Sequence, residues 1–397
     1  MRRVVVVGGS VGGVHAAEAL RDQGFEGEVT LVSADAQLPY DRPPLSKDVL
    51  LGKTDADRIL LRPAGWYEER DIDLRLGNAA RGLDAASKTL SLADGSELGY
   101  DGLVLATGSA ARTLTLPEGS PEVHVVRTLE DVEGLRPELQ PGRRLVMIGA
   151  GFIGLEIAAV AVQLGLEVTV LEYAPSPLAR VFGGEVGGWY RGLHERNGVR
   201  MICGVSITGT EPAPGGVTMT LDNGETVTAE VVVAGIGAAP AIEWLAGSGV
   251  ELGNGVLCSP DLRTSAPDVV AVGDIANWRN AAFDEEMRVE HWTNASEQGR
   301  HAVTTLLGDS APFSSVPYFW TDQYDTKLRF VGRAAGFTDS RIESMTDDKL
   351  VVTIGRDGVL IGALCLGAPR HLARYKAAIQ AKTPWHDSAA LAEGLPA

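Results

Sequence analysis

The sequence predicts an α/β protein, because one succession of strand, glycine-rich turn, helix and strand occurs twice along the chain. The first copy begins at residue 3 and the second at residue 144. The length of 397 residues suggests two or three domains at roughly 150 residues each. No apolar run approaches the roughly 18 residues that a membrane-spanning helix needs, so we expect a soluble protein of the cytoplasm.

Charge and cysteine content argue against two classes of function. The chain has 35 Lys and Arg against 52 Asp and Glu, and this net charge of −17 disfavours sequence-independent binding to nucleic acid. The cysteines Cys203, Cys258 and Cys365 form no C-x-x-C pair and no metal-ligand cluster. We therefore expect reduced thiols, with no metal site and no disulfide relay.

The first glycine turn runs from Gly8 to Gly13 (GGSVGG), between a β-branched run at residues 3–7 and a helical stretch at 14–23. A second strand is expected at residues 28–33. In such a unit the unpaired N–H groups at the start of the helix bind a phosphate, and glycine leaves room for the turn and for a pyrophosphate. Ser10 replaces the usual middle glycine, so this dinucleotide-binding pattern is imperfect.

The second turn, Gly149 to Gly154 (GAGFIG), is a complete G-x-G-x-x-G after an expected strand at residues 144–148. The next strand ends at Glu172, 23 residues after Gly149, where a carboxylate can accept hydrogen bonds from an adenosine ribose. That carboxylate would repel the extra phosphate of NADP, and the following Tyr-Ala-Pro supplies no arginine to receive it. NADH is therefore favoured over NADPH.

Two further strands end in residues suited to a ligand. Residues 103–108 (LVLATG) end in Thr107 and Gly108, and residues 269–274 (VVAVGD) deliver Asp274 at a carboxyl end. Open α/β sheets bind ligands at these ends of their strands. Asp274 is a candidate acceptor for the ribityl hydroxyls of a flavin, and the alternative is a helix N-cap.

Seven motifs carry a resemblance to one family. They are PYDRPPLSK from Pro39, RTLEDV from Arg127, GFIGLEIAA from Gly151, AGIG from Ala234, AVGD from Ala271, EHWTNASEQGR from Glu290 and YFWTDQY from Tyr318. On these motifs the chain resembles the FAD-dependent pyridine nucleotide oxidoreductases. Among them it is most similar to the ferredoxin reductases of bacterial oxygenase systems, of the putidaredoxin reductase and biphenyl dioxygenase reductase type.

The resemblance implies two Rossmann-like dinucleotide-binding domains and a C-terminal α+β domain. Residues 1–110 and 238–312 would form a split FAD-binding domain, residues 111–237 an inserted NAD-binding domain, and residues 313–397 an interface domain. The family often has an acid at the position of Ala34, and the nearest acid here is Asp35.

The resemblance also implies the cofactor contacts. The expected FAD residues are Gly8, Gly12, Gly13, Asp35, Arg42, Lys47, Ala80, Thr107, Gly108, Arg127, Asp274 and Trp292. The expected NAD residues are Gly149, Gly151, Ile153, Gly154, Glu156, Glu172 and Gly237.

The same resemblance assigns the catalytic pair. Lys47 would direct its ammonium group to the reactive nitrogen of the flavin and stabilise negative charge there. Glu156 would pair with Lys47 and receive the amide of the nicotinamide. The alternatives are a surface lysine and a helix glutamate that faces water.

The partner implied by the resemblance is a small acidic iron–sulfur ferredoxin that feeds an oxygenase. Trp320 would line the edge where electrons leave, and Arg300 and Lys376 would contribute to a locally basic docking face. Core packing is the alternative for Trp320, and a solvated helix face is the alternative for the basic cluster of Arg370, Arg374 and Lys376.

Two rival functions remain open. A stand-alone NADH oxidase or peroxidase would normally use a cysteine close to the flavin, where this chain offers Ser46. A flavoprotein of the apoptosis-inducing-factor type would bind NADH and signal through a change of shape.

Overall fold

The first glycine turn belongs to a five-stranded parallel sheet. The computed structural model describes residues 1–346 and 348–393, without the side chain of Arg180. The strand order is β20-β7-β1-β2-β3, with β1 in the centre. The strands are β1 (Arg3–Val7), β2 (Glu28–Val32), β3 (Ile72–Arg75), β7 (Gly102–Leu105) and β20 (Val269–Ala271). Four consecutive valines of β1 are buried, as expected for a parallel strand that is covered on both faces.

The second turn belongs to a sheet with the same plan. Its order is β12-β11-β10-β16-β9, and the central strand β10 again leads into the glycine turn. The strands are β9 (Val123–His124), β10 (Arg144–Ile148), β11 (Glu167–Glu172), β12 (Arg200–Cys203) and β16 (Val231–Ala234). The helices after the two turns are α1 (Val11–Asp22) and α4 (Phe152–Gln163). The two dinucleotide-binding units predicted from the sequence are therefore confirmed.

The second unit is inserted into the first. The chain leaves the first sheet after β7 and returns to it at β20, with the whole second sheet in between. The outgoing β8 (Ser109–Ala111) and the returning β17 (Ala238–Pro240) pair with each other in antiparallel fashion. The hydroxyl of Thr107 donates to the carbonyl of Ala241 at 2.7 Å, and the carbonyl of Gly108 accepts from the N–H of Ala241 at 2.9 Å. These contacts hold together the two segments that connect the units.

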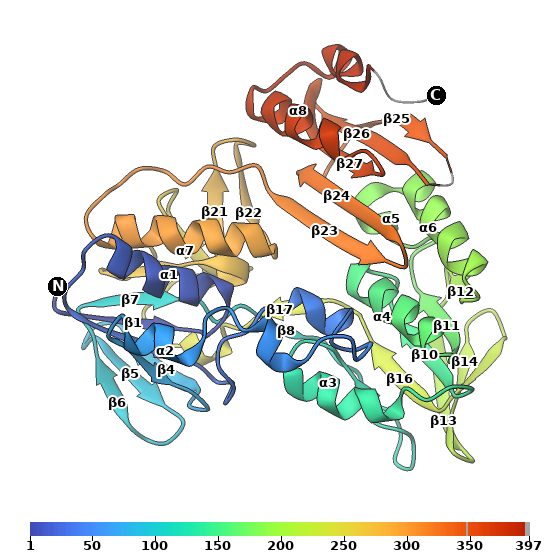
Figure 1. The fold of residues 1–397 in the computed structure, drawn as a ribbon, viewed down its shortest axis with the longest axis horizontal. Helices are drawn as coiled ribbons and strands as arrows, with labels where there is room; N and C mark the ends of the chain where they lie inside the picture. The colour runs from blue at the N-terminus through green and yellow to red at the C-terminus, as the bar shows by residue number, and fades with distance from the viewer. Residues whose placement is uncertain (347, 394–397) are drawn as a thin grey trace.

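Smaller sheets and helices surround the two central sheets (Figure 1). Two antiparallel sheets consist of β4 (Ala80–Asp84), β5 (Thr89–Leu92) and β6 (Glu97–Gly99), and of β13 (Ile207–Ala213), β14 (Gly216–Leu221) and β15 (Thr226–Ala229). A mixed sheet has the order β18-β19-β21-β22, in which β19 and β21 are parallel and the other neighbours antiparallel. Its strands are β18 (Leu252–Gly253), β19 (Gly255–Cys258), β21 (Ala276–Asn280) and β22 (Glu285–Arg288). The other helices are α2 (Ala64–Glu68), α3 (Leu129–Leu135), α5 (Ala179–Phe182), α6 (Gly184–Arg196) and α7 (Trp292–Leu306). Short 3-10 helices are η1 (Pro43–Ser46), η2 (Ala56–Ile59), η3 (Arg136–Glu138), η4 (Glu243–Leu245), η5 (Gly273–Ile275) and η6 (Trp385–Ala392).

Helix α7 lies against α1 on the first sheet (Figure 1). The approach is close at Gly299, where an added Cβ would overlap the carbonyl oxygen of Gly12. A side chain at this position would push the two helices apart. Within the described ranges, none of the helices is long and apolar enough to cross a bilayer.

The C-terminal part is an antiparallel sheet with one covering helix. Its order is β23-β24-β27-β26-β25, and the helix is α8 (Pro369–Gln380). The strands are β23 (Tyr318–Gln323), β24 (Thr326–Gly332), β25 (Asp339–Met345), β26 (Leu350–Arg356) and β27 (Val359–Leu366). The edge strand β23 runs between α7 and α4, and so connects the first unit with the second (Figure 1).

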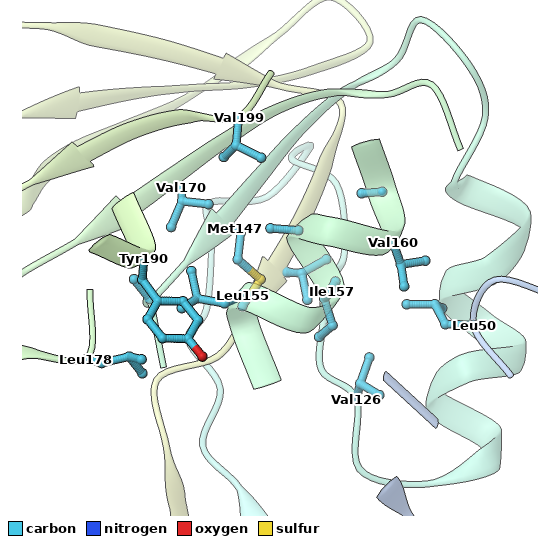
Figure 2. Close-up of a cluster of buried hydrophobic side chains, with 14 of the residues drawn as sticks. Leu50, Val126, Met147, Leu155, Ile157, Val160, Val170, Leu178, Tyr190 and Val199 are labelled. Atoms are coloured by element: carbon cyan, nitrogen blue, oxygen red, sulfur yellow. The ribbon is translucent and has the colours of Figure 1, made fainter. Parts of the chain in front are cut away.

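Helix α4 occupies the centre of the largest hydrophobic core. Its sequence FIGLEIAAVAVQ is apolar around nearly the whole circumference, as expected for a helix covered on all sides. Figure 2 shows Met147 and Val170 of the sheet on one side of α4, and Leu50 and Val126 on the other. Phe330 of the C-terminal sheet belongs to the same core, so all three parts of the molecule pack together around this helix.

Replacing Leu155 by alanine should lower the free energy of unfolding by about 2–5 kcal/mol, because the side chain is fully buried in this core and its loss leaves a cavity. The matched control is Leu307→Ala, at a leucine that is 41% exposed, which should cost under about 0.5 kcal/mol. Urea unfolding followed by circular dichroism measures both, and equal losses would contradict the central place of α4.

Candidate functional site

Three helix N-termini have no side-chain cap in the part of the chain that the structure describes. Helices α1, α4 and α7 begin after Ser10, Gly151 and His291, and among the described residues no side chain caps any of them. The first N–H groups of a helix have no partner inside the helix. They are therefore available to anionic groups of a bound molecule, which the helix dipole also favours.

The first turn has the close packing that a dinucleotide-binding turn requires. Gly8 has φ +122°, and an added Cβ there would overlap the carbonyl oxygen of Ala106. A Cβ at Gly13 would overlap the carbonyl oxygen of Gly8, so glycine is required where the helix meets the turn. Gly12, in the first turn of α1, faces α7: an added Cβ there would come 3.2 Å from Val272 and 3.5 Å from the carbonyl oxygen of Ala295.

The second turn combines close packing with open space. A Cβ at Gly149 would come 2.5 Å from the carbonyl oxygen of Gly235, and one at Gly154 would overlap that of Gly149. At Gly151 and Gly237, an added Cβ would meet no atom of the described chain within 4 Å. Ile153 beside them is 47% exposed. The residues present therefore fit a pyrophosphate that approaches the backbone at the start of α4.

Glu172 lies beside this second turn. One carboxylate oxygen accepts the N–H of Ala150 at 2.6 Å, and the other accepts the N–H of Ala174 at 2.7 Å. Both bonds fix the carboxylate at the end of β11. Tyr173, the next residue, is 71% exposed.

Asp274 and Arg127 meet at the first unit. Arg127 donates to Oδ2 of Asp274 at 2.9 Å, and the hydroxyl of Ser109 donates to the same oxygen at 2.7 Å. Asp274 is inside η5, which begins after Val272, so the alternative of a helix N-cap is wrong. The carboxylate is held by partners from two other segments.

Arg42 lies within reach of the charge of Arg127. Burial lowers the pKa of Arg42, and the positive charge of Arg127 lowers it further. Asp35 is 3.4 Å from Arg42 and accepts a hydrogen bond from the hydroxyl of Tyr40 at 3.2 Å. Arg42 is paired with Asp35 and Arg127 with Asp274, and two arginines in one region suit a bound pyrophosphate. Ala80, expected at the adenine, is the first residue of β4.

Lys47 and Glu156 form an ion pair at the junction of the three parts. Their charged atoms are 2.9 Å apart, and the side chains are only 17% and 5% exposed. Oε2 of Glu156 also accepts from the hydroxyl of Ser46 at 2.5 Å, and Oε1 accepts from Thr321 at 2.6 Å. Burial raises the pKa of Glu156, and the charge of Lys47 opposes that shift. The alternatives of a surface lysine and a water-facing glutamate are wrong.

Three half-buried aromatic side chains form a row on β23 and α7. The rings of Trp292 and Trp320 meet edge to face with centroids 6.5 Å apart, and Tyr318 stacks on Trp320 at 5.9 Å. The indole N–H of Trp292 donates to Asp41 at 2.7 Å. Trp320 itself is half-buried.

Arg300 is 52% exposed on α7, next to a second arginine. It donates to the hydroxyl of Ser296 at 2.9 Å and lies 3.3 Å from Glu18, which also binds Arg62 at 2.6 Å. One acid is thus shared by two arginines. The basic residues of α8, which include Lys376, are exposed.

Sequence reasoning missed several residues of these clusters. Ser46, Ser109 and Thr321 bind the predicted carboxylates, and Gln298 accepts the N–H of Gly273 at 2.7 Å. Thr321 follows three aromatic residues in the motif YFWTDQY, and nothing in that pattern singles it out as a partner of Glu156. The three cysteines are free, and burial raises the pKa of Cys258 and Cys365 to about 12.

Comparison with known proteins agrees with this geometry. Residues 2–299 match the pyridine nucleotide-disulphide oxidoreductase model, and residues 318–395 match the C-terminal reductase model. A ferredoxin–NAD(P)(+) reductase from a Sphingomonas species is 36% identical over 96% of this chain and 93% of that protein. A rubredoxin–NAD(+) reductase from Pseudomonas putida is 35% identical over 93% of this chain and 94% of that protein.

A solved structure has the same fold over nearly the whole length. It is the covalent complex of putidaredoxin reductase with putidaredoxin, with a TM-score of 0.92 and 33% identity over 96% of this chain and 94% of that one. The relatives are thus NAD(P)H-dependent reductases of small electron-transfer proteins. The chain belongs to the pyridine nucleotide-disulphide oxidoreductase family.

Proposed function

We propose that this protein is an FAD-containing, NADH-dependent ferredoxin reductase of the cytoplasm. It would take a hydride from NADH and pass single electrons to a small iron–sulfur ferredoxin that feeds an oxygenase. The observation that carries the proposal is the buried Lys47–Glu156 pair between two glycine-turn units. The ferredoxin reductases and the putidaredoxin complex among its relatives support the choice of partner.

We assign FAD to the split unit of residues 1–110 and 238–312, and NADH to the inserted unit of residues 111–237. Residues 313–397 would form the interface domain. Arg42 would bind the FAD pyrophosphate together with the first turn, and Arg127 would contact FAD beside Asp274. Asp274 would bind the ribityl chain, and Asp35 would act through Arg42.

The chain's own residues prepare the site for hydride transfer. A bound flavin supplies the ability to accept two electrons together and release them one at a time. Lys47 places a positive charge where negative charge develops, in a site shielded from water. Glu156 keeps that ammonium in place and offers an acceptor to the carboxamide of the nicotinamide. Ser46 and Thr321 hold the carboxylate from both sides.

Electrons would leave past the aromatic row of Trp292, Trp320 and Tyr318. The nearby cluster of Arg62 and Arg300 would attract an acidic partner, with Lys376 contributing from α8. The raised thiol pKa values argue against an oxidase or peroxidase that works through a cysteine, because a buried neutral thiol is a poor nucleophile.

The purified protein should be yellow, release FAD on denaturation, and oxidise NADH rapidly only when an electron acceptor is added. Steady-state NADH oxidation against a panel of small ferredoxins, with a rubredoxin for comparison, tests the proposal. Equally fast NADH oxidation by dioxygen alone would favour a stand-alone NADH oxidase. A colourless folded protein, or turnover that stays very slow with every acceptor, would refute the proposal.

Replacing Glu172 by glutamine should reduce the preference for NADH, because the negative charge that repels the phosphate of NADPH is removed. We expect the ratio of kcat/KM for NADH over NADPH to fall by about tenfold, equivalent to about 1.4 kcal/mol. Glu211→Gln, at an exposed acid on β13, is the control and should leave the ratio unchanged. An unchanged ratio in Glu172→Gln would show that the ribose lies elsewhere.

Replacing Arg300 by alanine should raise the KM for ferredoxin by about fivefold, because a docking charge is lost. Reduction of ferricyanide by NADH should stay the same, since that small acceptor needs no docking surface. Arg279→Ala is the matched control, because Arg279 is 53% exposed and is also paired with one acid. Loss of both activities in Arg300→Ala would assign Arg300 to folding instead of docking.

A further inference from the structure

Glu156 is the end of a buried chain of hydrogen bonds. Thr321 donates to its carboxylate at 2.6 Å, and the side-chain amide of Gln323 donates to the hydroxyl of Thr321 at 3.1 Å. The other end of Gln323 lies 2.9 Å from Nε2 of His194, whose Nδ1 lies 3.1 Å from the hydroxyl of Tyr324. We call these four residues, Thr321, Gln323, His194 and Tyr324, the Glu156 array.

The Glu156 array depends on the docking of the C-terminal sheet. Thr321 and Gln323 lie on β23 two residues apart, so their side chains share one face of the strand, and Trp320 points to the opposite face. His194 comes from α6 of the inserted unit. Thr321, Gln323 and His194 are at most 2% exposed. Water therefore cannot take the place of any of them as a hydrogen-bond partner.

All hydrogen bonds of the Glu156 array donate in the same direction along the chain of residues. Burial lowers the pKa of His194 to about 4, so the ring is neutral at pH 7 and carries one proton. The amide oxygen of Gln323 can only accept, so that proton is on Nε2. Nδ1 then accepts from the hydroxyl of Tyr324. Every donor in the array therefore points toward Glu156.

The opposite direction would require a protonated Glu156. The carboxyl group would have to donate to Thr321, Thr321 would donate to the amide oxygen of a rotated Gln323, and the proton of His194 would move to Nδ1. The direction of the array and the ionised state of Glu156 are thus coupled. Hydrogen bonds in such chains strengthen one another in an environment of low dielectric.

We propose that Thr321, Gln323, His194 and Tyr324 are positioning residues that hold Glu156 ionised and correctly oriented against Lys47 for hydride transfer. This inference rests on the proposed reductase function. The other ionisable groups around Glu156 are Lys47 and the buried Tyr190 of α6. Asp322 of β23 also faces Tyr190.

The test uses two threonines that differ in little but location. Thr353 on β26 is fully buried in the same sheet and donates to a nearly buried carboxylate, that of Glu343, at 2.8 Å. Thr321→Val should slow flavin reduction by NADH on the order of tenfold, measured by stopped flow, because a hydrogen bond to a charged group is lost. Thr321→Ser should retain the wild-type rate, and Thr353→Val should leave it unchanged.

The pH profile gives a readout that general destabilisation would not move. Flavin reduction should require ionised Glu156, so the rate should fall as the pH drops through its pKa. Removing the hydroxyl donor raises that pKa further, and the acid-side fall should move to higher pH in Thr321→Val. The profile of Thr353→Val should match that of the wild type.

Nitrogen-15 NMR of labelled histidine tests the array without turnover. The ring shifts of His194, assigned by their loss in His194→Gln, should show a neutral ring protonated on Nε2 at pH 7. Tyr324→Phe removes only the last donor and should change the Nδ1 shift while urea unfolding stays close to wild type. Because Tyr324→Phe leaves Thr321 in place, it also tests the array if Thr321→Val does not fold.

The outcomes separate the two proposals. Wild-type protein that binds no FAD or does not oxidise NADH would refute the proposed function. Active wild-type protein with a proton on Nδ1 of His194, or a Thr321→Val variant within twofold of the wild-type rate and with an unmoved pH profile, would refute the positioning role alone.

Discussion

The structure depends on the burial of two opposite charges at the junction of its three parts. Removing an ion from water costs several kcal/mol, and a partner charge offsets this only when the remaining hydrogen-bonding capacity is also satisfied. Glu156 meets that condition through Lys47, Ser46 and Thr321. Because these partners come from the first unit and from the C-terminal sheet, the pair is complete only when both close over α4. The site is therefore shared by all three parts of the molecule.

Strand β23 shows how a single element serves two needs. Alternate side chains point to opposite faces of a strand. One face sends Thr321 and Gln323 toward Glu156 and His194, and the other sends Trp320 toward Trp292 of α7. The proposed hydride side and the proposed electron exit are thus positioned by the same six residues. A shift of this strand by one residue would exchange its two faces and disrupt both.

The sequence predicted the features that repeat or that follow a local pattern. Both glycine turns and the strands around them follow from periodicity and turn chemistry, whereas the insertion of one unit into the other was implied by the family resemblance. The partners of Glu156 did not, because they are set by the docking of distant segments: 165 residues separate Glu156 from Thr321. His194 lies near the end of a helix in a run of polar residues, and nothing local predicts that it is fully buried.

The net charge of −17 and the proposed basic docking face are compatible because they act over different distances. At physiological ionic strength charges are screened beyond about 8 Å, so an approaching acidic protein experiences the nearest residues far more than the whole molecule. Arg62 and Arg300 share one glutamate, Glu18, so this group of three side chains carries a net positive charge. The remaining acids of the chain would repel such a partner from other faces. The overall charge can therefore favour one docking site by making the alternatives unfavourable.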